Sequence, residues 1–231
     1  MNASKYKPAE NAKNGGRNLQ MIHIDLILSV RNVILRSMEP MQSIQKIANR
    51  GFFTLKSCLE QGVSRYELKK LEASGEIEKV EHGLYMLDGT IDDEMFMPQV
   101  LNENIVYSHE TALFLLGFSD LIPDKYTITV PLGYHSKKLW KNFYVRQTPA
   151  ELLNKGVVEI DSLYGNPIKV YCIERTLCEL MHSRKDFTKE RFIPAIQRYM
   201  RLKGRNVGKI VDFSRMFNVE RKIRPYVEVL I

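Results

Sequence analysis

A helix stop followed almost at once by a helix start is the feature that most restricts how this chain folds. In the stretch GVSRYELKK, Gly62 is typical of the end of a helix. Two residues later, Ser64 and Glu67 form the S-x-x-E pattern of a capping box, in which each side chain binds the other residue's free backbone N–H. The stretch therefore predicts two helices joined by a tight turn, the second over residues 65–73.

The residues on either side of this turn extend the prediction. Thr54 is a candidate N-cap for the first helix, and the stretch EIEKVEHGLYML predicts two short strands around a turn at His82–Gly83. On the second helix Leu68 and Leu71 share one face, and polar residues occupy the opposite one. Helix, turn, helix and hairpin together indicate a winged helix-turn-helix, in which the second helix enters the major groove of DNA.

The rest of the chain predicts a larger α+β domain. Strand-like runs that alternate with turn signals occur at residues 125–131, 143–148, 157–161 and 167–172. Helical patterns follow them at residues 173–183, 189–204 and 206–217. The predicted fold class is α+β: a tail over residues 1–37 that is partly disordered, a winged helix-turn-helix over 38–90, and a mixed α/β C-terminal domain over 91–231. The acidic stretch DGTIDDEMF is interpreted as the connection between the two domains.

Composition excludes several classes of protein. The longest apolar run, LFLLGF, is far shorter than the roughly 20 residues that a membrane-spanning helix needs. Three cysteines in 231 residues cannot form a disulfide framework, so the chain is expected in a reducing cytoplasm.

The net charge of +7 is unevenly distributed along the chain. Residues 184–231 carry thirteen Lys and Arg against five Asp and Glu, and residues 89–123 carry no base at all. Such a basic C-terminal region suits phosphate or an acidic partner, although a solvated helix face is an equally good interpretation. The predicted phosphate-binding face comprises Lys137, Lys138, Lys141, Arg146, Arg198, Arg201, Lys203, Arg205 and Lys209.

Motifs of enzymes and metal sites do not occur. The chain has no P-loop, no G-x-G-x-x-G and no G-x-S-x-G, and its histidines and cysteines do not match a zinc spacing. His109, in SHETA, is paired with no nucleophile, so an ordinary polar role is favoured over a general base. No catalytic residue, metal or cofactor is predicted. A basic Mg²⁺-dependent nuclease using Asp161, Glu174 or Glu179 remains the enzyme alternative.

The second helix supplies the candidate DNA-reading residues. Arg65, Tyr66 and Lys69 lie near its N-terminal end, the end that meets base edges, and Arg65 has the geometry to pair with guanine through two hydrogen bonds. His82 is either a plain turn residue or a wing contact to DNA. Because winged helices also dock proteins, and because this segment is rich in glutamate, a protein-docking module is the second alternative.

Three segments resemble one known family. SIQKIANRGFFTLKSCLEQGVSRYELKKLEASGEIEKVEHGLYML is similar to the winged helix of AbiEi-type antitoxins, the antitoxin half of type IV toxin–antitoxin systems. YSHETALFLLGFSDLIPDKYTITVP and IKVYCIERTLCELMHSRKD resemble two stretches of the second domain of that family, and the three occur in the family's order over residues 41–200. Residues 1–37 match nothing in it.

The resemblance implies a protein with two roles. The winged helix would bind inverted repeats in double-stranded promoter DNA and repress its own operon, and the C-terminal domain would counteract a nucleotidyltransferase-type toxin without a stable complex. Such pairs are tied to abortive infection of bacteria attacked by phage. The DNA-binding residues implied are Ser64, Arg65, Tyr66, Lys69, Lys70, Lys79 and His82. Arg175, in ERTL, matches the family pattern, and either an antitoxic role or an ion pair with a nearby acid would account for it.

Overall fold

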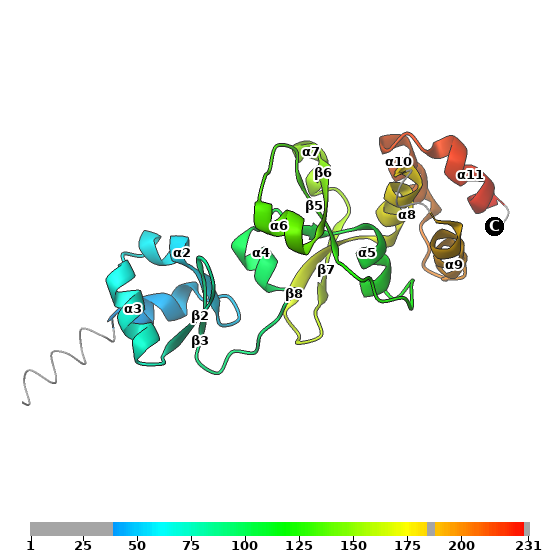
Figure 1. Ribbon diagram of the computed structural model, residues 1–231. Helices are drawn as coiled ribbons and strands as arrows, with labels where there is room; N and C mark the ends of the chain where they lie inside the picture. The colour runs from blue at the N-terminus through cyan, green and yellow to red at the C-terminus, as the bar shows by residue number, and fades with distance from the viewer. Residues whose placement is uncertain (1–38, 184–187, 229–231) are drawn as a thin grey trace, which may run out of the picture. The chain divides into compact units, whose positions relative to one another are not determined.

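The computed structural model describes residues 39–183 and 188–228, and these divide into two compact units at Thr90–Ile91. Figure 1 shows the elements of both units. The tail predicted over residues 1–37 lies outside the described residues. Among the described helices, none is both long and apolar enough to cross a membrane.

The N-terminal unit is a winged helix-turn-helix, as predicted. Its elements follow a helical stretch over residues 39–47 and are β1 (Phe52–Thr54), α2 (Leu55–Glu60), α3 (Arg65–Ala73), β2 (Ile77–Glu81) and β3 (Leu84–Leu87). In its sheet, β3 lies between β1 and β2 and is antiparallel to both. The helices and the sheet share one apolar core, made of Ile44, Phe53, Cys58, Val63, Leu68, Leu71, Ile77 and Tyr85.

Two capping boxes set where the helices of this unit begin. At α3, Ser64 Oγ accepts the N–H of Glu67 at 3.2 Å, and the Ser64 N–H donates to Glu67 Oε2 at 2.7 Å. At α2, Thr54 and Ser57 make the same reciprocal pair of bonds. Gly62, with φ of 80°, adopts the left-handed conformation between the helices, which glycine tolerates better than any other residue. The predicted helix over 65–73 and its cap are therefore confirmed.

The C-terminal unit is built on a five-stranded mixed sheet with strand order β6-β5-β4-β8-β7. Its strands are β4 (Val106–Tyr107), β5 (Thr127–Pro131), β6 (Tyr144–Thr148), β7 (Val157–Asp161) and β8 (Pro167–Tyr171). The β5–β6 and β4–β8 pairs are parallel, whereas β4–β5 and β7–β8 are antiparallel. Strands β6 and β7 are consequently the two edges of the sheet.

Helices account for most of the core of this unit. They are α4 (Met97–Leu101), α5 (His109–Leu115), α6 (Lys137–Asn142), α7 (Ala150–Leu153), α8 (Ile173–His182), α9 (Lys189–Met200), α10 (Val207–Met216) and α11 (Glu220–Glu228). Helix α8 contacts α5, α9, α10 and α11, and its residues from Ile173 to Met181 are all buried. Figure 1 shows α8 to α11 gathered beside one end of the sheet.

The acidic stretch DGTIDDEMF is more than the predicted connection. Asp93 is only 1% exposed, and its carboxylate accepts hydrogen bonds from Ser162 Oγ at 2.5 Å and Asn166 Nδ2 at 2.8 Å. Phe96 is also buried. From Ile91 onward the stretch therefore belongs to the C-terminal unit, and Asp93 holds the turn between β7 and β8, because a buried carboxylate needs hydrogen-bond donors.

Candidate nucleic-acid interface

The exposed face of α3 carries the predicted reading residues. Leu68 and Leu71 are buried in the core of the N-terminal unit, so the rest of the helix surface is left to solvent. Arg65, Lys69 and Lys70 are all exposed, and Tyr66 is 77% exposed. Arg65 and Tyr66 lie at the N-terminal end of the helix, and Lys69 and Lys70 follow one turn later. An exposed aromatic ring together with three exposed cationic side chains is an arrangement suited to contact base edges and phosphates.

The capping box also places a carboxylate at this end of α3. Hydrogen bonds from the Ser64 backbone and side chain lower the pKa of Glu67, so its charge is retained at neutral pH. The positive end of the helix dipole stabilises that charge. Ser64 itself is exposed, but Glu67 engages both its hydroxyl and its backbone N–H, so its predicted DNA contact would require the hydroxyl to be shared between Glu67 and the DNA.

The wing presents two further predicted residues. Lys79 lies on β2 opposite Tyr85 of β3, and His82 lies in the turn between the strands; both side chains are exposed. The acidic residues Glu76 and Glu78 are exposed as well, and Glu76 accepts a hydrogen bond from Ser74 Oγ at 2.8 Å. The wing is therefore mixed in charge, whereas the exposed face of α3 carries Arg65, Lys69 and Lys70.

The basic residues predicted in the C-terminal unit fall into two groups. Lys137, Lys138 and Lys141 lie on α6, and Arg146 lies on the adjoining edge strand β6. The other group runs from the end of α9 to the start of α10, all of it exposed: Arg198, Arg201, Lys203, Arg205 and Lys209. Within it, Arg198 Nη1 lies 3.6 Å from Asp120 Oδ1, so part of its charge is already matched by an exposed acid.

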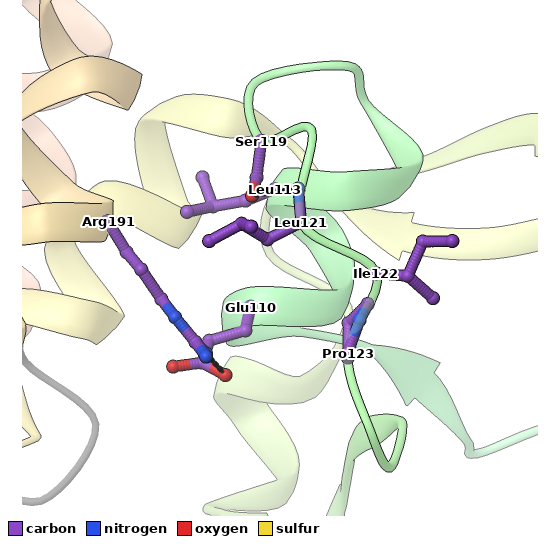
Figure 2. A pocket seen from close by; sticks show the side chains of 7 residues that line it. All are labelled: Glu110, Leu113, Ser119, Leu121, Ile122, Pro123 and Arg191. Carbon is purple, nitrogen blue, oxygen red and sulfur yellow. Dashed lines mark hydrogen bonds and ion pairs between the residues drawn. The ribbon is translucent and has the colours of Figure 1, made fainter.

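A groove runs beside α9. It has a volume of about 530 Å³, and Phe118, Leu121, Arg191, Arg198 and Arg201 are among its lining residues. Figure 2 shows Arg191 extending from α9 to the carboxylate of Glu110 on α5, where the two form an ion pair. The small cavity drawn there, about 10 Å³, has room for roughly one water molecule.

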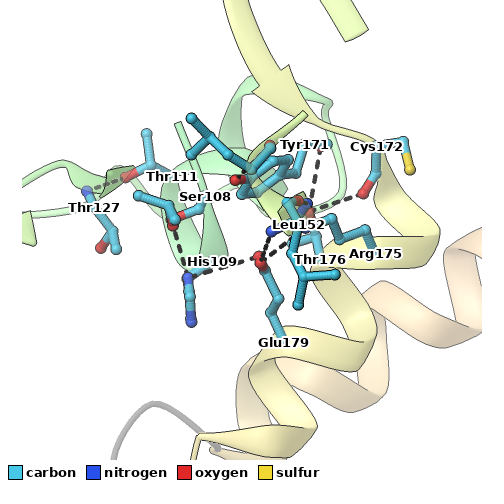
Figure 3. A network of polar contacts seen from close by, with 12 residues as sticks. Ser108, His109, Thr111, Thr127, Leu152, Tyr171, Cys172, Arg175, Thr176 and Glu179 are labelled. Atoms are coloured by element: carbon cyan, nitrogen blue, oxygen red, sulfur yellow. Dashed lines mark hydrogen bonds and ion pairs between the residues drawn. The ribbon is translucent and has the colours of Figure 1, made fainter. Parts of the chain in front are cut away.

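Arg175 is buried at the centre of a polar network and does not reach the surface (Figure 3). Its Nε donates to Glu179 Oε1 at 2.9 Å, and its Nη1 donates to the carbonyl oxygens of Leu152, at 2.6 Å, and Lys155. Its guanidinium carbon lies 3.4 Å from the centre of the Tyr171 ring. The prediction of an ion pair with a nearby acid is thus confirmed, and this arginine joins α8 to α7 and to the loop that follows α7.

Glu179 and His109 complete this network. Burial raises the pKa of Glu179 to about 7, and the Arg175 guanidinium opposes that shift. The second carboxylate oxygen of Glu179 lies 3.9 Å from His109 Nδ1, which is also 3.0 Å from Ser108 Oγ. Ser108 occupies the N-cap position of α5, but its hydroxyl binds Thr129 and His109 and does not cap the helix. These contacts account for His109 without a catalytic role.

The acids considered for a nuclease are separated in the described structure. Asp161 is exposed at the end of β7, Glu174 accepts a hydrogen bond from Tyr199 at 3.0 Å, and Glu179 is paired with Arg175. Over residues 39–183 and 188–228, no three His, Cys, Asp or Glu side chains come together in a way that could hold a metal ion. The described residues therefore assemble no metal-binding carboxylate cluster.

Comparison with known families bears on the N-terminal unit. Residues 42–87 match a family model described as transcriptional regulator, AbiEi antitoxin. The chain is similar to AbiEi antitoxins over this unit. The match spans the winged helix from its first described helix to β3, the same segment that carried the resemblance in the sequence. It supports an antitoxin and regulator role.

Two further comparisons add little to this AbiEi-type match. A solved structure, the RV2827C protein from Mycobacterium tuberculosis, aligns with a TM-score of 0.44 and 14% identity, covering 78% of this chain and 75% of that one. A search among curated proteins returned no match.

Proposed function

We propose that this chain is the antitoxin and autorepressor of a type IV toxin–antitoxin system. Its winged helix would bind inverted repeats in the promoter of its own operon, with α3 in the major groove. The observation that carries the proposal is the solvent-exposed set Arg65, Tyr66, Lys69 and Lys70 on α3, within the segment that matches AbiEi regulators. Lys79 and His82 would contact the DNA from the wing.

The C-terminal unit is assigned two contributions in this proposal. Its exposed basic groups would neutralise phosphates of the same duplex, which a repressor needs to remain bound at cellular salt concentrations. It would also counteract a cognate nucleotidyltransferase-type toxin without a stable complex, in phage defence by abortive infection. This antitoxic role rests on the family resemblance of residues 107–131 and 168–186, whereas the phosphate contacts rest on exposed lysines and arginines.

A gel-shift titration tests the DNA-binding half. The full chain is titrated against its own upstream DNA and against a scrambled duplex, with Arg65→Ala and Lys69→Ala alongside. Lys56→Ala is the matched control, because Lys56 is an exposed lysine on α2, outside the reading helix. Preference for the native sequence should fall in Arg65→Ala and Lys69→Ala and persist in Lys56→Ala. Equal binding of both duplexes by the wild-type chain would reject the repressor role and favour protein docking.

A charge reversal tests the phosphate contacts of the C-terminal unit. Changing Arg201, Lys203 and Arg205 to glutamate should weaken binding to every duplex and reduce the dependence of affinity on salt concentration. Reversal of Arg215, Arg221 and Lys222, which lie outside the predicted face, is the control for an equal change in net charge. Unchanged affinity and salt dependence in the first variant would remove this group from the interface.

Co-expression tests the antitoxic half. The nucleotidyltransferase gene that this proposal expects immediately downstream is expressed from a separate promoter, with the full chain or with the Arg65→Ala variant. Growth should be restored in both cases, since the repressor and antitoxic roles are assigned to different units. A failure of both to restore growth would reject the antitoxin assignment.

A further inference from the structure

The single tryptophan of this chain lies on a helix that contributes nothing to the core. Trp140 is on α6, none of whose six residues is buried, and it is 52% exposed. Figure 1 shows α6 beside the edge strand β6, on which Tyr144 is 45% exposed. Large aromatic side chains usually lie in a core or an interface, so two exposed ones on neighbouring elements call for an explanation.

The exposed rings are held in defined positions by their neighbours. The ring of His135 lies over that of Trp140, with centroids 6.4 Å apart and planes inclined by 29°. Lys125 Nζ donates to the Trp140 carbonyl oxygen at 3.3 Å and lies 5.2 Å from the centre of the Tyr144 ring. One lysine therefore links α6 to the start of β6. We name the group Lys125, His135, Lys137, Trp140, Lys141 and Tyr144 the α6 surface.

The charge of this surface has one sign on α6. The helix, of sequence KKLWKN, carries three lysines and no acid, and Lys137 and Lys141 are exposed on either side of Trp140. Asp124 is nearby, where it accepts a hydrogen bond from the Tyr144 hydroxyl at 3.4 Å. Cationic side chains are thus interleaved with aromatic rings along the chain, and phosphate is the group complementary to the cationic side chains.

We propose that the α6 surface binds single-stranded nucleic acid, with a base stacked on Trp140 and phosphates held by the lysines around it. Aromatic platforms between cationic side chains are the usual means of binding single strands, since every unpaired base offers a flat face. A duplex would satisfy the lysines but leave the rings unused, because its bases are already stacked on one another. The carboxylates of an acidic protein would match the charge, but they would leave the ring of the half-exposed Trp140 without a stacking partner.

This activity goes beyond operator binding, which the proposed function assigns to α3 and to phosphate contacts with the duplex. The α6 lysines belong to those phosphate contacts, and a single-stranded ligand would use them together with the rings. Because Trp140 is the only tryptophan, its fluorescence reports on this surface and on no other part of the chain. Failure of operator binding in the Arg65→Ala gel shift and failure of single-strand binding at the α6 surface are therefore observed independently.

The first experiment is a fluorescence titration of the full chain. Oligo(dT) and oligo(rU) of about 12 nucleotides, within the usual site size of such surfaces, should quench Trp140. Inorganic polyphosphate and a duplex of arbitrary sequence are the controls for phosphate without free bases, and they should bind without comparable quenching. Equal quenching by polyphosphate, or binding of single strands with unchanged fluorescence, would overturn the stacking role and leave only a cationic surface.

Variants then test the two kinds of contact by anisotropy of a labelled oligo(dT). Trp140→Ala should weaken binding roughly 5- to 100-fold, the effect of removing the platform for one stacked base, and Trp140→Phe should recover part of it. Lys137→Gln with Lys141→Gln should lower the slope of log affinity against log salt by about 1.4, or about 0.7 for each phosphate that is no longer neutralised. The sources of the ligand are distinguished by comparing oligo(dT) with oligo(rU).

Tyr164→Ala is the matched control for loss of an exposed aromatic ring. Tyr164 is 54% exposed, which is close to the exposed fraction of Trp140. It lies in the turn between β7 and β8, however, and β7 is the edge strand opposite to β6. Its removal should leave oligo(dT) binding unchanged. A loss in Tyr164→Ala equal to that in Trp140→Ala, or wild-type affinity in Trp140→Ala, would contradict the assignment of the site to the α6 surface.

Discussion

Helices α3 and α8 both carry arginine, lysine or glutamate at helical spacing, yet they use these charges in opposite ways. On α3 the charged side chains are exposed and the apolar ones alone are buried, whereas on α8 Glu174, Arg175 and Glu179 are all buried with the apolar residues. An exposed charge is free to meet a partner, and a buried one must find its partner inside the fold. Burial therefore separates the candidate interface from structural charge in this protein.

The largest effect is expected from removing Arg175. Arg175→Met leaves the Glu179 carboxylate buried without its cation and two carbonyl oxygens without their donor, so the C-terminal unit should lose about 3–5 kcal/mol of unfolding free energy. Urea unfolding followed by Trp140 fluorescence reports on this unit. The double variant Arg175→Met with Glu179→Leu should recover part of the loss. A wild-type midpoint for Arg175→Met would make the comparison of the two helices invalid.

The next effect concerns pH. Burial raises the pKa of Glu179 from its ordinary 4.5 to about 7, so the folded chain retains a proton that the unfolded chain has released between these values. This proton on Glu179 contributes to the unfolding free energy. The contribution is fully present below pH 4.5 and is lost as the pH rises through 7, and the loss is at most about 3 kcal/mol. The unfolding free energy of the wild type should fall relative to that of Glu179→Gln between about pH 5 and pH 8. A constant difference would show that Arg175 keeps this carboxylate ionised throughout.

A smaller effect is expected at Gly156, which packs against the buried network. It has φ of 75°, and an added methyl group would lie 2.7 Å from Phe213 Cζ and 3.3 Å from Arg175 Cδ. Gly165 has φ of 76° with open space around it, which makes it the matched control. Gly165→Ala should cost about 1 kcal/mol from backbone strain, and Gly156→Ala about twice that or more. Equal losses in urea unfolding would mean that the network can shift to accept the methyl group.

The smallest effect is expected at the cap of α3. Ser64→Ala removes the hydroxyl that accepts the Glu67 N–H and should cost about 1 kcal/mol, seen as faster hydrogen exchange of the amides at the start of α3. Thr188 occupies the N-cap position of α9 with no side-chain capping bond, so Thr188→Ala should leave the exchange of α9 amides nearly unchanged. If both variants behave alike, the capping box is not what positions the reading helix.

The same contrast explains what the sequence can predict. The bounds of α3 follow from signals close to one another in the chain, namely the Gly62 stop, the Ser64–Glu67 cap and the leucine spacing, and together they predict this helix correctly. The ion pair of Arg175 with Glu179 is also within reach, because opposite charges at i and i+4 adjoin on a helix. The burial of this ion pair cannot be predicted in the same way, because the carbonyl groups that Arg175 binds lie 20 and 23 residues earlier in the chain.

Short elements and long-range contacts are what the sequence does not reveal. Strand β4 has two residues and α6 has six, which are too few to show a period in the sequence. The parallel pairing of β5 with β6 requires a crossover connection, and no local pattern predicts that pairing. Asp93 belongs to an acidic stretch that has the composition of a connection between domains. Its burial is not predictable from the sequence, because its hydrogen-bond donors, Ser162 and Asn166, lie far from it in the chain. The rings of the α6 surface do have a local signal, since HSKKLWKNFY interleaves them with lysines.

Arginine-to-lysine replacement at position 65 tests the central claim most directly. Lysine keeps the charge of Arg65 but lacks the planar fork that pairs with guanine through two hydrogen bonds. The affinity ratio between the chain's own upstream DNA and a scrambled duplex is measured for the wild type and for Arg65→Lys at one salt concentration. The account predicts that the ratio falls by roughly 5- to 100-fold while binding to the scrambled duplex is retained. An unchanged ratio in Arg65→Lys would contradict base readout by Arg65 and reduce its role to phosphate attraction.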